Sequence, residues 1–245
     1  MSKPIEVVPG KAVTIRFDAG KCIHSRHCVL DRPDVFVPNI EGEWIRPDAA
    51  TADEVAELAH NCPSGAIMYD RHDGQPQETP PKVNTVRVRE NGPLAFHGEL
   101  AIAGQPPAMR ATLCRCGKST HKPYCDGSHA AGGFAASGEP MTKASEALAQ
   151  RAGAVTITPA ANGPLLITGN LEIVSGTGRT IDRCGKTALC RCGGSSNKPF
   201  CDGSHKTTEF KPVKFSNTEA QKVWLCGCKR SAGKPFCDGS HKKLT

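Results

Sequence analysis

The chain has 245 residues, of which 38% are hydrophobic and 5% aromatic, so it can form two or three small domains with modest cores. Its formal net charge is +7, but basic residues are not interleaved with aromatic ones, and we therefore expect no nucleic-acid partner. No apolar run approaches the length of a membrane span, and the start MSKPIEVVPG lacks the charged and apolar regions of a signal peptide, so we expect no membrane partner and a cytoplasmic location.

The first part of the chain, residues 1–70, is predicted to form a small domain of its own. Val13 to Phe17 has the composition of a strand. Thr51 and Glu54 form a capping box, which predicts a helix from this point to Cys62 with one apolar face.

Three cysteines in this domain indicate a shared ligand. Cys22 and Cys28 are separated by five residues, and Cys62 is followed by proline. Bacterial-type ferredoxins hold a cluster with C-x2-C-x2-C and a remote Cys-Pro, and here Ser25 stands where the middle cysteine would be. Residues 11–70 resemble a divergent single-cluster ferredoxin, similar to the small ferredoxins that serve bacterial cytochromes P450.

The resemblance implies one iron–sulfur cluster on these three thiols. Three thiols suit a [3Fe-4S] cluster. A [4Fe-4S] cluster, the second alternative, would need a fourth ligand from His24, Ser25, His27 or solvent. The remaining alternative is that the three cysteines only pack in a core or are free thiols.

A larger repeat follows a linker at residues 71–83, which contains one glycine and three prolines. Asn91-Gly-Pro-Leu94 recurs as Asn162-Gly-Pro-Leu165, and short strand-like runs introduce both copies. We expect small β units, with one short helix between them from about Lys143 to Gln150. The predicted boundaries are 84–138 for the first unit, 139–153 for the connector, 154–209 for the second unit and 210–245 for a third, shorter unit.

Each unit contains one copy of the same ligand pattern, with successive ligands 2, 9 and 4 positions apart. Sulfur and imidazole ligands at a fixed spacing, repeated three times, indicate metal sites. Every copy ends in Cys-Asp-Gly-Ser-His. The twelve candidate ligands are Cys114, Cys116, Cys125 and His129, then Cys190, Cys192, Cys201 and His205, then Cys226, Cys228, Cys237 and His241.

The full string C-x-C-x2-S-x3-P-x-C-D-G-S-H is similar in all three copies to the CDGSH iron–sulfur (NEET) family, with Ser119, Ser195 and Ser231 at the serine position. This resemblance covers about half of the chain. It implies that each copy binds a [2Fe-2S] cluster through three cysteines and one histidine. Loaded clusters would lower the net charge of the chain to about +2.

The spacing agrees with this assignment. A helix that begins at Asp126 would place Cys125 and His129 near one face of its first turn, where a single iron could bind both. The C-x-C pair could then hold the other iron. Three cysteines and one histidine are also a zinc ligand set, but most zinc modules use pairs spaced C-x2-4-C.

The cysteine count leaves one thiol over. The three copies use nine of the 13 cysteines and the N-terminal domain uses three, so only Cys184 is unassigned. We expect it to be a free thiol, and we expect no disulfide framework because thiols that hold iron must stay reduced.

Together these features predict an α+β protein in which a ferredoxin-like domain precedes small β-rich cluster-binding units. No nucleophile motif or phosphate loop is recognisable, so we do not expect an enzyme. We expect electron transfer with a redox partner such as a ferredoxin reductase or another oxidoreductase. The alternative is a carrier or redox sensor that gives [2Fe-2S] clusters to apo iron–sulfur proteins. We also expect the second and third copies to pair, and a copy left without a partner could join two chains into a homo-oligomer.

Overall fold

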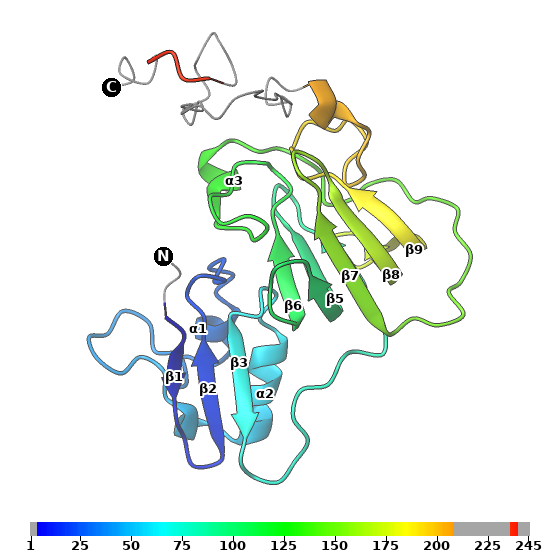
Figure 1. Ribbon diagram of the computed structural model, residues 1–245. Coiled ribbons are helices and arrows are strands. Elements are labelled where there is room, and N and C mark those ends of the chain that lie inside the picture. Colours follow the sequence, from blue (N-terminus) through cyan, green and yellow to red (C-terminus); the bar gives the residue numbers. More distant parts are fainter. Residues whose placement is uncertain (1–3, 208–235, 240–245) are drawn as a thin grey trace, which may run out of the picture.

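The N-terminal domain is a three-stranded antiparallel sheet with short helices beside it. In the computed structural model, which describes residues 4–207 and 236–239, the strand order is β1-β2-β3 (Figure 1). Its elements are β1 (Glu6–Val8), β2 (Val13–Phe17), α1 (His27–Asp31), the 3₁₀ helix η1 (Pro47–Ala49), α2 (Ala52–His60) and β3 (Ile67–Arg71). Alternate residues of β2 are buried, as expected for a strand with one face on the core.

The capping box predicted for α2 is present. Thr51 Oγ1 accepts a hydrogen bond from Glu54 N at 3.3 Å, and Glu54 Oε2 accepts one from Thr51 N at 2.8 Å. Val55 and Leu58 face the core from this helix. The helix ends at His60, two residues before the predicted end, so that Cys62 lies in the turn leading to β3.

The six strands that follow form one mixed sheet. They are β4 (Thr85–Val88), β5 (Leu94–Ile102), β6 (Ala108–Leu113), β7 (Ala154–Pro159), β8 (Leu165–Val174) and β9 (Thr180–Leu189). A short helix α3 (Ser128–Ala131) follows β6, and the 3₁₀ helix η2 (Ser204–Thr207) follows β9. The described chain is therefore rich in strands and has few helices.

The first and second units exchange strands in a crosswise manner. Within the first unit β4 pairs with β5, and within the second β7 pairs with β8, both antiparallel. In addition β4 pairs in parallel with β8 of the second unit, and β7 pairs in parallel with β5 of the first. Each long strand therefore pairs along one edge with β4 over one half and with β7 over the other. Both strands also shift register midway, at His97/Leu100 against β6 and at Thr168/Leu171 against β9.

This pairing differs from our expectation that the second and third copies would pair. The partner of the second copy is the first, and the third copy lies almost entirely outside the described residues. The sequence offset between the first two copies could not reveal the exchange, because parallel pairing of β4 with β8 joins residues far apart along the chain.

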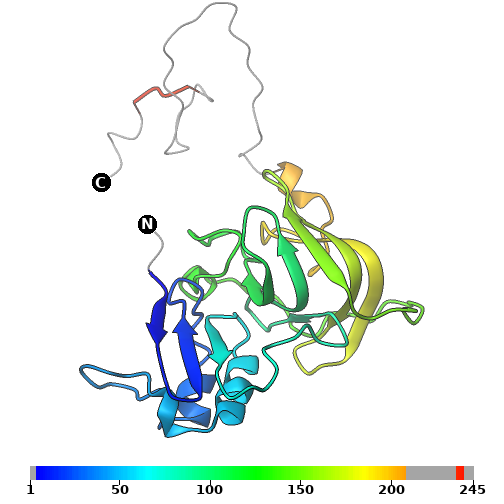
Figure 2. The same ribbon diagram turned by 60° about the horizontal axis from the view of Figure 1, so that its bottom comes forward.

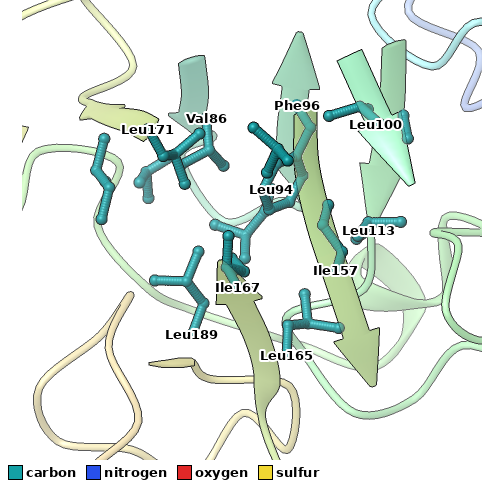
Figure 3. Packing of buried hydrophobic residues seen from close by; sticks show 14 of the residues in the cluster. Val86, Leu94, Phe96, Leu100, Leu113, Ile157, Leu165, Ile167, Leu171 and Leu189 are labelled. Atoms are coloured by element: carbon teal, nitrogen blue, oxygen red, sulfur yellow. The ribbon is translucent and has the colours of Figure 1, made fainter. Parts of the chain in front are cut away.

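One hydrophobic core lies between the exchanged strands (Figure 3). Leucine, isoleucine and valine side chains from all six strands fill it, and the residues that the figure labels come from both units. They are Val86, Leu94, Phe96, Leu100, Leu113, Ile157, Leu165, Ile167, Leu171 and Leu189. Because both units contribute to one core, neither buries its apolar face alone.

The helix predicted in the connector, from Lys143 to Gln150, is wrong. Residues 139–153 run as irregular chain beside β9, where Lys143 N donates to Ile181 O at 2.8 Å and Ser145 Oγ accepts from Arg183 N at 3.2 Å. These bonds to the strand replace the hydrogen bonds that a helix would make within itself.

The N-terminal domain lies beside the first unit. Figures 1 and 2 show its blue-to-cyan strands near β5 and β6, with β9 on the far side of the sheet. Among the described residues, the structure has no helix of the length and apolarity needed to cross a membrane.

Candidate metal centres

The first copy places its four donors in two close pairs. Cys114 and Cys116 follow β6, and their sulfurs are 3.7 Å apart. Cys125 Sγ lies 3.4 Å from Nδ1 of His129, which is on α3. Two thiolates on one tetrahedral metal with bonds of about 2.3 Å lie about 3.8 Å apart, and a thiolate and an imidazole about 3.6 Å. Each pair therefore fits one metal ion, as a two-iron cluster requires.

The two pairs also face each other. Burial, together with the nearby thiols of Cys114 and Cys116, raises the pKa of Cys125 to about 11. All three sulfur ligands are buried, whereas His129 is only half-buried. Among the described residues no three donors converge on a point where they could hold a single ion.

Residues between the ligands that recur in all three copies build the loop in this copy. Cys114 N donates to Pro123 O at 2.8 Å, after a cis Lys122–Pro123 bond, and Cys125 N donates to Thr112 O at 3.0 Å. Ser119 Oγ donates to the carbonyl of Tyr124 at 2.6 Å. These bonds hold the two halves of the ligand set beside each other.

Asp126 ties the end of the loop. Its Oδ1 accepts from Ser128 N at 3.0 Å and its Oδ2 from Thr120 N at 2.8 Å. Burial alone would raise the pKa of Asp126, but the hydrogen bonds from Ser128 and Thr120 outweigh it and hold the pKa well below its usual range. The helix begins at Ser128, with Gly127 at its N-cap, so the prediction that it begins at Asp126 was wrong by two residues.

The second copy repeats this loop. The sulfurs of Cys190 and Cys192 are 3.8 Å apart, and Ser195 Oγ donates to Phe200 O at 2.7 Å. Asp202 accepts from Ser204 N and Ser196 N, as Asp126 does from its own neighbours. Cys201 N donates to Ala188 O at 2.9 Å, so it occupies the place of Cys125.

His205 differs from His129 in its contact. Its Nδ1 lies 2.9 Å from the carbonyl oxygen of Asn162, in the turn before β8. A nitrogen that faces a carbonyl oxygen carries the proton, so this ring must turn to present Nδ1 to a metal.

The two copies touch each other at their C-x-C segments. Cys116 and Cys192 form an isolated antiparallel bridge. A Cβ atom on Gly117 would come within 2.7 Å of Cys192 O, and one on Gly193 would come within 2.7 Å of Cys116 O. Both glycines also have positive φ. The backbone conformation and the close contact with the other copy therefore both require glycine at these two positions.

The arginine inside each C-R-C segment is a component of the site that the ligand pattern does not identify. Arg115 is 1% exposed and donates to the carbonyls of Gly92, Arg89, Ser137 and Ala136. Arg191 donates to the carbonyls of Gly163 and Ala160. Burial lowers the pKa of Arg115 to about 10, and the nearby Cys190 of the other copy opposes this shift. The repeated Asn-Gly-Pro turns were the signal that could have identified these partners.

The third copy cannot be described in the same way. Cys237 belongs to the described residues, but Cys226, Cys228 and His241 lie outside them. The assignment of these four ligands therefore stays a prediction.

The N-terminal domain brings its three predicted cysteines to one cavity of about 320 Å³. This is far larger than the space of about 30 Å³ that one water occupies, and it suits a cluster rather than a single ion. Burial raises the pKa of Cys22 and of Cys28, and the charge of Cys62 raises both further. Cys22 Sγ accepts a hydrogen bond from His24 N at 3.4 Å.

The lining of the same cavity distinguishes between the candidates for a fourth ligand. His24 and Ser25 line it, whereas His27 does not and is exposed. The backbone at His24 is left-handed, with φ of 54°, which turns the loop around the cavity.

Cys184 lies apart from these sites, on β9. It packs against the core of the sheet, and burial raises its pKa to about 11. Both observations agree with a thiol that remains protonated and uninvolved.

Comparison with known proteins gives two family matches. The family model described as "Iron-binding zinc finger CDGSH type" matches residues 82–130, 162–206 and 207–242. The model described as "Divergent 4Fe-4S mono-cluster" matches residues 8–72. No curated protein and no solved structure matches the chain.

Proposed function

Because the chain belongs to the CDGSH-type iron-binding family and carries a divergent mono-cluster ferredoxin domain, we propose that this iron–sulfur protein transfers electrons. One observation carries the proposal: a ferredoxin-type site and the first CDGSH site occur in one chain, with their domains in contact. Each bound cluster would supply one-electron redox chemistry. The protein's part is to hold the ligands, bury them and bring the sites together.

The donor arrangement supports [2Fe-2S] clusters in the CDGSH copies. Cys114 with Cys116, and Cys125 with His129, form pairs that each fit one iron. Imidazole in place of a fourth thiolate leaves such a cluster one charge less negative, which raises its reduction potential. Lys118 N lies 3.4 Å from Cys116 Sγ, and hydrogen bonds to sulfur raise the potential further.

The N-terminal cluster is proposed to be [3Fe-4S] or [4Fe-4S]. Three thiols around one cavity support the first, and the description of the matching family supports the second. In the second case the fourth ligand would come from His24, Ser25 or solvent, since His27 does not line the cavity.

Metal counting with electron paramagnetic resonance (EPR) tests the cluster assignment. After anaerobic purification we expect about nine irons per chain with a [3Fe-4S] cluster, or about ten with a [4Fe-4S] cluster. An oxidised [3Fe-4S] cluster gives an EPR signal and an oxidised [4Fe-4S] cluster does not. Zinc in place of iron would contradict the proposal.

Reduction tests the function. A flavin-dependent ferredoxin reductase with its nicotinamide donor should reduce the protein reversibly and without loss of cluster. Irreversible bleaching on reduction would contradict an electron-transfer role.

A second candidate function, donation of [2Fe-2S] clusters to apo-proteins, is favoured by the exposure of one ligand. His129 is half-buried, whereas the three cysteine ligands of the same copy are buried. An acceptor protein or a proton can therefore reach the cluster at the histidine. Incubation with apo-ferredoxin should then load that protein. No loading under oxidising or reducing conditions would exclude this function.

A further inference from the structure

The two kinds of cluster site meet through a buried arginine of β6. Arg110 has a side chain that is only 3% exposed, and it reaches out of the six-stranded sheet into the N-terminal domain. Its Nη1 donates to the carbonyl oxygen of Cys62, and its Nη2 donates to that of Ile67, both at 3.3 Å. The arginine thereby holds both ends of the turn that carries a predicted cluster ligand.

The backbones are also in contact at this place. A Cβ atom on Gly65 would come within 2.6 Å of Arg110 O, and Gly65 has φ of +67°, so a glycine lets the turn lie against β6. Glu78 of the linker completes the contact, because its carboxylate lies 2.8 Å from Arg110 Nη2. A buried guanidinium with a carboxylate and two carbonyl partners is a fixed arrangement, since breaking it would leave a buried charge without partners.

A second contact joins the same two sites. Lys21 Nζ lies 5.8 Å from the centre of the Tyr124 ring. Lys21 directly precedes Cys22, and Tyr124 directly precedes Cys125. Likewise β6, which carries Arg110, ends one residue before Cys114. Each contact therefore links a residue beside a ligand of one site to the segment that carries a ligand of the other.

Domains joined by a linker usually move relative to each other unless their interface fixes them. Electronic coupling between two redox centres falls steeply with distance and is stronger along covalent and hydrogen bonds than through space. A fixed path from Cys62 through Arg110 and along β6 to Cys114 would therefore favour transfer between the centres.

We infer that Arg110 is a positioning residue that holds the N-terminal cluster site against the first CDGSH site, so that the two act as an internal electron relay. This inference rests on the proposed electron-transfer function. In each step one electron leaves the N-terminal centre, which is oxidised by one, and enters the first CDGSH centre, which is reduced by one. No bond is made or broken, and a flavin-dependent ferredoxin reductase supplies the next electron.

The test compares the loaded wild-type protein with Arg110→Met. One electron equivalent is added rapidly, and freeze-quenched EPR follows how the electron distributes between the two kinds of cluster. We expect the substitution to slow this redistribution roughly tenfold or more, while iron content and the potential of each cluster stay unchanged. It should also weaken the magnetic interaction between the two reduced centres and speed proteolysis within residues 71–83.

Two further variants distinguish loss of the Arg110 contact from the general effect of removing a basic side chain. Arg16→Met removes an arginine–aspartate pair with Asp70 inside the N-terminal domain and leaves the bonds of Arg110 in place, so it should transfer electrons as the wild type does. Lys21→Met weakens the second contact and leaves Arg110 in place, so it should slow transfer to a smaller extent. It also serves if Arg110→Met does not fold.

The outcomes distinguish failure of the relay from failure of the proposed electron-transfer function. If no reductase can reduce the wild-type protein, the proposed function fails. If the wild type is reduced but Arg110→Met, or Lys21→Met in its place, transfers electrons at the wild-type rate, the relay through this contact is wrong. A wild type whose reduced centres show no magnetic interaction would overturn it as well.

Discussion

The histidine ligand is the residue at which the CDGSH sites are most open to chemistry from outside. His129 is half-buried, so solvent reaches its ring, and a metal binds only the neutral imidazole. Protons and iron therefore compete for the same nitrogen, and we expect the clusters to be lost in mild acid.

Replacing this histidine with cysteine should slow that loss. His129→Cys, and likewise His205→Cys or His241→Cys, supplies a thiolate that binds iron more tightly and adds one negative charge to the cluster. The visible absorbance should decay more slowly at mildly acidic pH, and the potential of the altered cluster should fall. His72→Gln, an exposed histidine in the N-terminal domain, is the control and should change neither quantity. Unchanged acid lability and potential in all three cysteine variants would show that the histidines are not ligands.

Arg115 is a second residue whose replacement has a predictable cost. Its guanidinium satisfies four backbone carbonyls from the chain around the first ligand loop, and Arg115→Met would leave them without that donor. Each buried group left unsatisfied costs about 1–3 kcal/mol, so we expect the free energy of unfolding to fall by about 3 kcal/mol or more. Urea unfolding followed by circular dichroism measures it.

The second copy offers the matched comparison. Arg191 donates to two carbonyls, and Arg191→Met should cost about half as much. Equal costs at both positions would mean that the carbonyl bonds do not determine the loss.

At the scale of residues, the sequence can indicate which donors lie together, but it carries little information about their surroundings. Cysteine and histidine at fixed spacing indicate ligands by their chemistry alone, and the structure pairs Cys125 with His129 as the spacing suggested. The role of Arg115 could not be predicted, because its partners are carbonyls more than twenty positions away, and carbonyls leave no trace in a sequence.

Among the elements, the crosswise exchange of strands is what joins the first two units. Gly117 and Gly193 lie at its centre, each against the backbone of the other copy's cysteine. Since the two contacts are equivalent, a change at either glycine should act in the same way.

Gly117→Ala should destabilise the joined units by about 2 kcal/mol or more, because the new Cβ adds a close contact with Cys192 O to the strain of a positive φ. The control is Gly104→Ala, which has a similar φ of +75° with nothing within 4 Å of the new Cβ. Its cost should be limited to the backbone strain. Thermal unfolding measures both, and equal costs would contradict the role of the contact.

The outer face of β5 gives a pH-dependent contribution to stability. His97 is half-buried, and burial, together with the charge of Arg110, lowers its pKa. The unfolded chain binds a proton at this residue near pH 6.5, but the folded chain binds it only at lower pH. The contribution of His97 to the free energy of unfolding is therefore fully present above about pH 6.5. It decreases as the pH falls from there toward the pKa of His97 in the folded chain.

His97→Gln should reduce this dependence. We expect its urea midpoint to decrease less between about pH 7.5 and about pH 6 than that of the unaltered chain. His72→Gln provides the comparison for an exposed histidine. The same decrease in His97→Gln as in the wild type would show that the burial of His97 does not contribute.

Elements with strong local signals were predictable, whereas those set by distant contacts were not. The strand Val13–Phe17 and the helix capped by Thr51 follow from alternation and from a capping box, which act over a few residues. The prediction of a helix in the connector was wrong because Lys143 forms a hydrogen bond with the edge of β9. This contact overrides the helix propensity of the connector sequence. Pairing of the first copy with the second depends on which strand edges meet, and no local pattern encodes that.

Considered as a whole, the described part of the molecule has two bodies of strands, which the linker and the contacts of Arg110 and Lys21 join. Within the described residues, β4 to β9 supply the core of the exchanged strands together with Phe200 from the second ligand loop. The third copy contributes no described residue to that core.

A chain that ends at Thr207 should therefore keep the N-terminal domain and the joined units folded. We expect it to lose about two irons per chain, those of one [2Fe-2S] cluster, and to keep the unfolding temperature of the longer chain. Iron analysis and calorimetry measure the two quantities. Loss of iron from the first two copies as well would mean that they depend on the third.

The crosswise exchange of β4 and β7 also bears on how a chain of this kind can arise. A copy taken alone would present the open edges of β5 and β8 to solvent, where they would pair with whatever strand was available. A second copy of the same unit could supply the missing strands, so we expect a single-copy chain to form a symmetric dimer. In the joined chain, neither half can be deleted without exposing these edges of the other. The pair is thus the smallest unit that covers these strand edges, and a further copy can be added beside it without changing them.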